Sequence, residues 1–167
     1  HPEKNGAIFP SDVFCRSTKK VWWKCSKGID HEWESSPRQR VKNSSCKFCD
    51  GFYLSNTNSL EKTFPDIAQQ WHIEKNGDLK AEQFTYRSNQ NVWWKCSSGE
   101  DHEWLTSIAK RVKNPNCPFC TGYKVSKTNS LLHCFPEIAK EWDFNKNFHL
   151  KPADVTYGSS RMVHWKC

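Results

Sequence analysis

The sequence has few of the residues that build a large aliphatic core. Of its 167 residues only one is methionine, and 36% are hydrophobic. The length alone would fit one domain, but this composition argues against one extensive apolar core. No apolar run approaches the roughly 20 residues that a membrane-spanning helix requires. No secretory signal is recognisable at this N-terminus.

Two residue types are present in excess, with nine cysteines and nine tryptophans. This balance favours small modules held together by aromatic contacts and bound metal. The 25 Lys and Arg residues outnumber the 18 Asp and Glu residues, for a net charge of +7. A surplus of this size permits a polyanionic partner without requiring one.

The sequence repeats itself at a constant offset of 71 positions. The motif WWKC at residues 22–25 recurs at residues 93–96, and as HWKC at residues 164–167. Between residues 22–49 and 93–120, 18 of 28 positions are identical without any gap. The two copies must therefore share a fold, because shared composition alone does not give such identity.

The repeat divides the chain into three parts. Residues 1–57 form a first copy, residues 58–128 a connector helix with a second copy, and residues 129–167 a connector helix with the start of a third. The third motif reaches only its first cysteine, Cys167, so we expect that it cannot close a metal site by itself. Because the chain opens with His1 within a repeat, we also expect it to come from a longer protein.

Each copy is expected to be a small α+β module. Residues 21–25 and 31–35 are β-branched and aromatic runs around a turn, which is typical of a β-hairpin. A basic stretch at residues 38–42 leads to a CxxC knuckle followed by Gly51, where a tight turn is needed. A helix capped by Asn58 or Ser59 follows, which Pro65 divides into two pieces.

The cysteines and histidines at repeated spacing predict two zinc sites. Three thiolates and one imidazole complete a tetrahedral shell, which is the arrangement of a structural site. The alternative for a CxxC is a redox pair or disulfide, but neither needs a histidine and a third cysteine repeated at the same distance. Free thiols of this kind indicate an intracellular, reducing compartment. The predicted ligands are Cys25, His31, Cys46 and Cys49 in the first copy and Cys96, His102, Cys117 and Cys120 in the second.

Other reactive groups lack a repeated ligand arrangement. Cys15 and Cys134 have no cysteine counterpart in the other copies and are interpreted as packing residues. Glu32 and Glu103 are expected to orient the ligand histidines or form salt bridges, because a closed metal shell leaves no water for a general base to activate. With no nucleophile triad or phosphate-binding glycine loop, we expect no catalysis within this segment. The remaining histidines are interpreted as surface or packing residues: His72, His133 and His149.

These motifs together resemble the tandem probable zinc-ribbon or treble-clef zinc-finger domain family of unknown function. The resemblance rests on an FP-IA-W helix, an Asn-rich connector, WWKC, HEW and the knuckle, and it covers nearly the whole chain. It implies tandem copies, sometimes beside nuclease-like domains, and a general supposition of nucleic-acid binding. The first copy departs from the pattern with Lys47 where the second has Pro118, and no residues match the nuclease chemistry of some relatives.

One tryptophan of each WWKC pair is expected at the surface. Neighbouring side chains of a strand point to opposite faces, so both cannot enter the same core. Because the third copy keeps Trp165 but has His164 before it, the second position is assigned to the core, with Trp23, Trp94 and Trp165. Trp22, Trp93 and His164 are then expected on the outer face, as candidates for stacking on a base. The alternative is that the preceding connector helix covers them.

Basic residues at repeated positions are candidates for phosphate contacts, which would position a nucleic-acid backbone without reading its sequence. For any one lysine, a solvated surface position is the alternative. Residues 12–51 carry nine bases against five acids, which favours the first copy. The candidates are Lys24, Arg38, Arg40 and Lys42, then Lys95, Lys110, Arg111 and Lys113.

Two functional hypotheses remain open at the level of sequence. The first is a zinc-dependent array that binds DNA or RNA. The second is a zinc-stabilised structural or protein-interaction module of a larger assembly, or an accessory domain of a nuclease-type enzyme. Neither hypothesis includes a membrane or a small-molecule substrate. The salt dependence of ligand binding separates the two hypotheses, because phosphate contacts weaken steeply as ionic strength rises.

Overall fold

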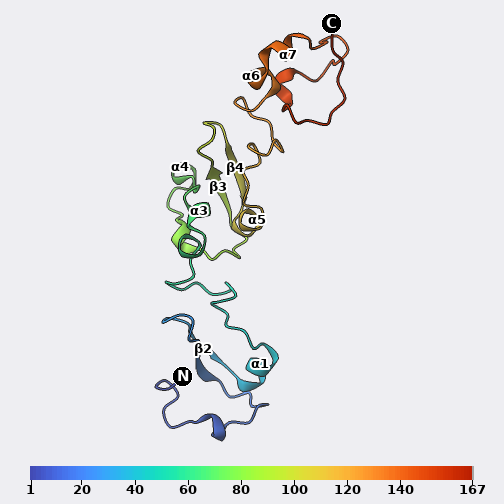
Figure 1. The fold of residues 1–167 in the computed structure, drawn as a ribbon. Coiled ribbons are helices and arrows are strands. Elements are labelled where there is room, and N and C mark those ends of the chain that lie inside the picture. Colours follow the sequence, from blue (N-terminus) through green and yellow to red (C-terminus); the bar gives the residue numbers. More distant parts are fainter. Residues whose placement is uncertain (167) are drawn as a thin grey trace. The chain divides into compact units, whose positions relative to one another are not determined.

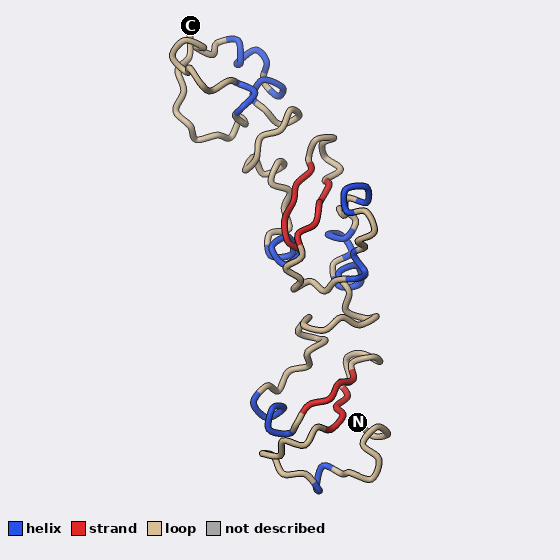
Figure 2. The backbone as a smooth tube through the Cα atoms, turned by 180° about the vertical axis from the view of Figure 1, so that it is seen from behind, coloured by secondary structure: helices blue, strands red, loops and turns tan. Residues whose placement is uncertain are grey.

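The structure is a computed structural model that describes residues 1–166, so the prediction for Cys167 lies outside the described residues. The chain forms two compact units. One comprises His1–Gln69 with Asp78–Gln90, and the other comprises Gln70–Gly77 with the chain from Asn91 onward. Figure 2 shows that loops surround a few short helices and strands in each unit. Within residues 1–166, no helix is both long and apolar enough to cross a membrane.

Each complete copy contains the predicted antiparallel hairpin (Figure 1). Strand β1 (Val21–Lys24) pairs with β2 (Glu32–Ser35), and β3 (Asn91–Lys95) pairs with β4 (Glu103–Ser107). The register places the second tryptophan of WWKC opposite that of HEW, as in the pair formed by Trp94 and Trp104. Trp94 is fully buried, which confirms its assignment to the core, whereas Trp23 in the first copy is only half-buried. The assignment of Trp165 to the core is wrong, because this side chain is 45% exposed.

A short helix that the sequence does not predict follows each hairpin. Helix α1 (Pro37–Lys42) and helix α5 (Ile108–Lys113) each have six residues, too few to show a helical period in the sequence. A serine caps each of them, as Ser107 does by accepting a hydrogen bond from the N–H of Lys110. These helices lead into the knuckle, whose turn ends at a glycine with positive φ, 73° at Gly51.

The connector helix is divided at its proline, as the sequence predicts. Ser59 caps helix α2 (Leu60–Thr63), and Pro65 begins helix α3 (Pro65–Ala68). The same division recurs as α6 (Leu131–Cys134) and α7 (Pro136–Lys140). The remaining elements are helix α4 (Ile73–Asn76) and the 3-10 turns η1 (Pro10–Asp12), η2 (Ala81–Gln83) and η3 (Pro152–Asp154).

The end of the connector extends the hairpin that follows it. The N–H of Lys95 donates to the carbonyl of Gln70 at 2.7 Å, and Trp71 forms a bridge with Trp94. The amide side chain of Asn76 bonds both the N–H and the carbonyl of Trp93, each at 2.8 Å. An asparagine does the same in the other copies, with Asn5 on Trp22 and Asn147 on His164. The exposed strand edge is thereby paired.

Candidate metal centres and basic grooves

The eight predicted ligands form two clusters. In each copy, one cysteine follows the first strand, the histidine precedes the second strand, and two cysteines lie on the knuckle. Within each cluster, the donor atoms all lie within 4.8 Å of one another. Most of these side chains are buried, and both histidines are 4% exposed. The fold thus brings together the residues that the spacing selected: Cys25, His31, Cys46 and Cys49, and Cys96, His102, Cys117 and Cys120.

The distances between donor atoms fit tetrahedral zinc. Zinc–sulfur bonds of about 2.3 Å and a zinc–nitrogen bond of about 2.0 Å separate two sulfurs by about 3.8 Å and sulfur from nitrogen by about 3.5 Å. In the first copy, the sulfurs of Cys25 and Cys49 lie 3.7 Å apart. The Nδ1 atom of His31 lies 3.5 Å from the sulfur of Cys49 and 3.8 Å from that of Cys46. The equivalent distances in the second copy are nearly the same, at 3.7 Å, 3.6 Å and 3.9 Å.

The ligand histidine is oriented from its other ring nitrogen. In the first copy, the hydroxyl of Thr57 lies 3.0 Å from Nε2 of His31 and donates to Asp30 at 3.1 Å. Because the hydroxyl has one proton and gives it to the carboxylate, it accepts the Nε2–H of the imidazole. The Nδ1 atom is then unprotonated and available to a metal. The sequence prediction does not include this threonine, although the Asp-His pair and the Thr-Asn-Ser segment both recur in the second copy.

The second copy repeats this chain of hydrogen bonds. Thr128 lies 3.2 Å from Nε2 of His102 and donates to Asp101. Burial acts to raise the pKa of Asp101, but hydrogen bonds from the Thr128 hydroxyl and the Lys127 N–H outweigh it. The pKa therefore lies below its usual value. Asp101 is thus a carboxylate that holds the threonine in place.

The glutamates beside the ligand histidines do not orient them, which corrects one of the two roles expected from the sequence. Glu103 instead pairs with His72 at 3.0 Å, Lys95 at 3.2 Å and Lys75. The Lys75 ammonium holds the pKa of Glu103 at about 2. Glu32 forms the equivalent group, and its expected salt bridges are present, with His1 at 2.8 Å, Lys4 at 2.7 Å and Lys24 at 3.3 Å.

A glycine in the hairpin turn leaves room for each histidine ring. A Cβ atom on Gly28 would lie 2.6 Å from Cδ2 and Nε2 of His31. A Cβ atom on Gly99 would lie 2.7 Å from the same atoms of His102. Both distances are far inside van der Waals contact, so any larger residue would displace the ligand ring.

Without a metal, the protein environment does not favour ionisation of all the cysteine thiols that would bind it. Burial raises the pKa of Cys49 to about 12, and the thiols of Cys25 and Cys46 add to the effect. Burial likewise raises the pKa of Cys117 to about 11. In contrast, the N–H of Lys27 lowers the pKa of Cys25. A divalent cation supplies the positive charge that lets all three thiols ionise, so metal binding and proton release are coupled.

Three thiolates and one imidazole at tetrahedral spacing, twice in one chain, define a protein of tandem zinc modules. The chain belongs to the family described as the probable treble clef zinc finger domain, whose model matches residues 1–52, 67–123 and 138–167. The sites fit two zinc ions, one in each complete copy. No curated protein matches the chain.

Arg111, which the sequence predicts as a phosphate contact, is buried inside the module. It is 1% exposed, and its guanidinium donates to the carbonyl of Asn114 at 2.9 Å and to Oε1 of Gln70 at 2.7 Å. It also lies over the rings of Trp94 and Trp104, 5.8 and 5.4 Å from their centroids. Burial lowers its pKa, while the charges of Cys117 and Cys96 act in the opposite direction. This arginine therefore offsets the negative charge of the thiolates.

The counterpart in the first copy, Arg40, is half-buried and lies in an equivalent position, but it donates to the carbonyl of Ser45 at 3.1 Å where Arg111 donates to Gln70. It donates to the carbonyl of Asn43 at 3.0 Å and lies over the rings of Trp23 and Trp33. Repetition of this arginine thus has a structural cause. Only the lysines and Arg38 among the basic candidates are exposed.

The first tryptophan of each WWKC motif is half-buried beneath a lysine. The ammonium of Lys75 lies 4.4 Å from the ring centroid of Trp93, and that of Lys4 lies 4.3 Å from that of Trp22. The segment that ends the connector therefore covers one face of the ring, which is the alternative that the sequence leaves open. A stacked base at this face would have to displace the lysine.

A groove recurs at the same place in both copies, between the second strand, the helix after the hairpin and the knuckle turn. All ten residues that line the groove of the first copy have counterparts 71 positions later in the second. The groove volumes are about 470 Å³ and 840 Å³. The second groove is lined by Lys110, Lys113 and Lys124 around the buried Arg111, with no acidic residue among its lining.

The first copy distributes its basic residues differently. Its groove is lined by Arg40 and Lys47 but also by Asp50. Arg38 and Lys42 line a separate hollow of about 400 Å³, together with Lys20. Both copies thus present two exposed basic residues on the helix that follows the hairpin, Arg38 and Lys42 in the first and Lys110 and Lys113 in the second, but only the second gathers them in one groove.

The lone cysteines are not packing residues, contrary to the expectation from sequence. Cys15 and Cys134 are both exposed, and neither belongs to a ligand cluster in residues 1–166. His72 is packed, as expected, at 5% exposure. It caps helix α4 and bonds Glu103.

Proposed function

We propose that this chain is a non-catalytic nucleic-acid-binding array in which zinc holds each module and a basic groove holds the ligand. The observation that carries the proposal is the recurrence of one groove at ten equivalent positions in two copies. Because the two copies share a fold, each module presents this groove at the same place, and the same class of ligand can bind to it in both. The recurrence supports a shared ligand that contacts successive modules.

The chemistry of the second groove favours an anionic ligand. Three exposed lysines surround a buried guanidinium, and no carboxylate lines the groove to neutralise them. Such a surface attracts phosphates, because each contact releases counterions from the nucleic-acid backbone. Because the groove of the first copy includes Asp50 and fewer cations, we infer that the second copy binds more tightly. This reverses the preference suggested by the net charge of residues 12–51.

The groove rims also carry exposed aromatic rings at one repeated position. Tyr123 is 85% exposed, and its counterpart Phe52 is 64% exposed. An aromatic ring beside lysines is the combination that binds single strands, since unpaired bases stack on the ring while the lysines contact the backbone. We therefore infer a preference for single-stranded DNA or RNA over duplexes.

The test is a titration of the zinc-loaded chain with single- and double-stranded DNA and RNA at several salt concentrations. Binding is followed by tryptophan fluorescence and by the anisotropy of a labelled oligonucleotide. We expect tighter binding of the single strands and a linear fall of log affinity with log salt concentration. Absence of binding to all four polymers at low salt would reject the proposal and favour the protein-interaction module.

A further inference from the structure

The cations that line the groove of the first copy have partners within the protein. Lys47 donates to the hydroxyl of Tyr53 at 3.2 Å, and Arg40 donates to two backbone carbonyls at 3.0 and 3.1 Å. Asp50 lines the same groove, so its two cations and one carboxylate give a net charge of +1. The four cations of the second groove give +4. A phosphate bound at the first groove would therefore need a further cation from a neighbouring segment.

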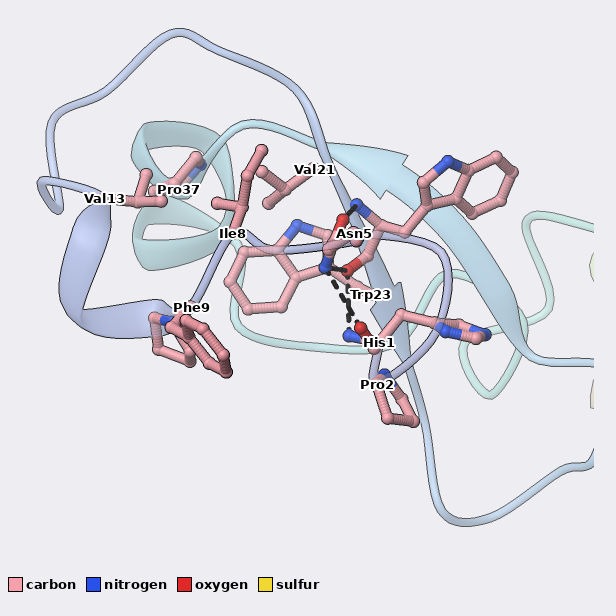
Figure 3. Close-up of a pocket in the computed structure, with 12 residues that line it drawn as sticks. His1, Pro2, Asn5, Ile8, Phe9, Val13, Val21, Trp23 and Pro37 are labelled. Carbon is pink, nitrogen blue, oxygen red and sulfur yellow. Dashed lines mark hydrogen bonds between the residues drawn. The ribbon is translucent and has the colours of Figure 1, made fainter.

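The apolar pocket beside strand β1 does not supply that cation. Figure 3 shows this pocket, which Ile8, Val21 and Trp23 line. No Lys, Arg, Asp or Glu is among its lining residues. The pocket is therefore unsuited to phosphate, and it does not extend the charge of the groove.

The chain at residues 85–87 packs against the knuckle turn of the first copy, within the same compact unit. The hydroxyl of Thr85 donates to the carbonyl of Gly51 at 2.7 Å, and the hydroxyl of Tyr86 donates to the carbonyl of Cys49 at 3.5 Å. Thr85 is buried, and a Cβ atom on Gly51 would lie 2.6 Å from the ring of Tyr86. The next residue, Arg87, is therefore held beside the knuckle.

Arg87 lies over the aromatic ring at the rim of the groove. Its guanidinium carbon lies 4.8 Å from the ring centroid of Phe52 and 5.8 Å from that of Tyr86. Phe52 is still 64% exposed, and Arg87 is exposed as well. Within residues 1–166, no carboxylate forms a salt bridge with Arg87. The protein thus holds an uncompensated positive charge against the one ring of this rim that is open to a base.

We propose that Arg87 is a nucleic-acid-binding residue of the first module. A base stacks on the part of the Phe52 ring that remains exposed, and the guanidinium binds a phosphate of the same strand through its N–H donors. The arginine thereby supplies the cation that the groove lining lacks. The inference rests on the proposed nucleic-acid-binding function. It adds a contact that the second module does not have, because the counterpart of Arg87 beside the second knuckle is Gly158.

The test starts from the zinc-loaded chain with Lys110, Lys113 and Lys124 replaced by alanine, so that the remaining binding reports on the first module. Arg87→Ala in this background is compared with Arg161→Ala, which removes an exposed arginine that lines neither groove. The probe is a labelled oligothymidylate, followed by fluorescence anisotropy at several salt concentrations. We expect Arg87→Ala to weaken binding about fivefold or more at low salt. The log–log salt slope should fall by about 0.7, the contribution of one phosphate contact, and Arg161→Ala should change neither quantity.

Arg87→Lys separates a phosphate contact from a purely structural role. Lysine keeps the charge but not the planar group that lies on Phe52, so the salt slope should return to that of the background chain. Native mass spectrometry and hydrogen exchange at β1 and β2 should give equal zinc content and equal protection in all variants. An arginine that only braced the knuckle would alter the exchange and leave the salt slope unchanged, which would overturn the inference.

The outcomes distinguish this inference from the proposed function. If the native chain binds no oligonucleotide, the proposed function fails and the inference fails with it. If the native chain binds but Arg87→Ala and Arg161→Ala have equal effects, the inference alone fails. It also fails alone if the background chain without the three groove lysines no longer binds. Tighter binding by Arg87→Ala would show that the guanidinium shields the Phe52 ring from the ligand, and would likewise overturn the inference.

Discussion

The hydroxyl of Thr57 lies 3.0 Å from Nε2 of His31, on the side of the ring opposite the thiols. This contact fixes which imidazole nitrogen is free for the metal, because Asp30 takes the hydroxyl proton. The second copy has the same relationship between Thr128 and His102 at 3.2 Å. The metal site is therefore larger than its four ligands. It includes a segment that follows the knuckle by several residues.

Replacing Thr128 by valine is expected to weaken the second zinc site without removing a ligand. Valine keeps the shape of the side chain but leaves Nε2 of His102 without its acceptor. The affinity of that site should fall about 10- to 100-fold, the usual effect of losing a partner of a ligating histidine. Competition against a chromophoric chelator measures the two affinities, and the first site serves as the internal reference.

The control for this prediction is Thr128→Ser, which keeps the hydroxyl. It should retain most of the affinity. Equal zinc affinity in Thr128→Val and the native chain would show that the threonine does not orient the histidine.

Loss of one ligand is expected to unfold its own module. Each ligand cluster, with its hydrogen-bonded threonine and aspartate, lies within one of the two compact units. In small zinc modules the metal-binding free energy is largely the folding free energy. Cys117→Ser should therefore lower the zinc content from two ions to one and remove exchange protection from β3 and β4. Protection should remain in β1 and β2, and Cys46→Ser should give the reverse pattern.

Native mass spectrometry and hydrogen exchange measure these two quantities. Loss of protection in both hairpins from either single substitution would contradict independent modules.

The buried arginine is expected to matter for stability and not for ligand contact. Arg111→Lys keeps a positive charge but cannot donate both to Asn114 and to Gln70. A hydrogen bond to a charged group contributes about 1.5–3 kcal/mol, so the loss of at least one of the two bonds should cost about 2–3 kcal/mol. Urea unfolding at fixed zinc concentration, followed by tryptophan fluorescence, measures it.

Lys113→Ala is the matched control, two residues away on the same helix and exposed. Its stability should stay within about 0.5 kcal/mol of the native value. If the two substitutions had equal effects on stability, Arg111 would have no special role in the interior.

The hairpins, the divided connector helix and both ligand sets could be predicted from the sequence, because each depends on local spacing that the repeat shows twice. Ser59 and Pro65 mark the start of their helices, and no distant contact is needed to identify them. The ligands could be recognised because thiolates and imidazoles at repeated spacing have few other uses.

Contacts between distant residues could not be predicted in this way. The hydroxyl of Thr57 contacts His31, which is 26 positions away, and Asp30, which is 27 positions away. Nothing in the local sequence of Thr57 indicates these partners. The sequence places Arg111 among the surface cations because its residue type is common there. Its burial depends on two tryptophan rings and on Gln70, which is 41 positions away. The grooves could not be predicted for the same reason.

The measurement that tests the account most directly compares two triple variants of the zinc-loaded chain in binding single-stranded oligonucleotides. One replaces the groove lysines, Lys110, Lys113 and Lys124, by alanine, and the other replaces three exposed lysines outside the grooves, Lys62, Lys80 and Lys146. The groove variant should bind at least about tenfold more weakly at low salt, with a log–log salt slope reduced by about 2, since each phosphate contact contributes about 0.7. The other variant should bind nearly as the native chain does. Equal losses in affinity and slope for the two variants would contradict a groove-bound nucleic acid.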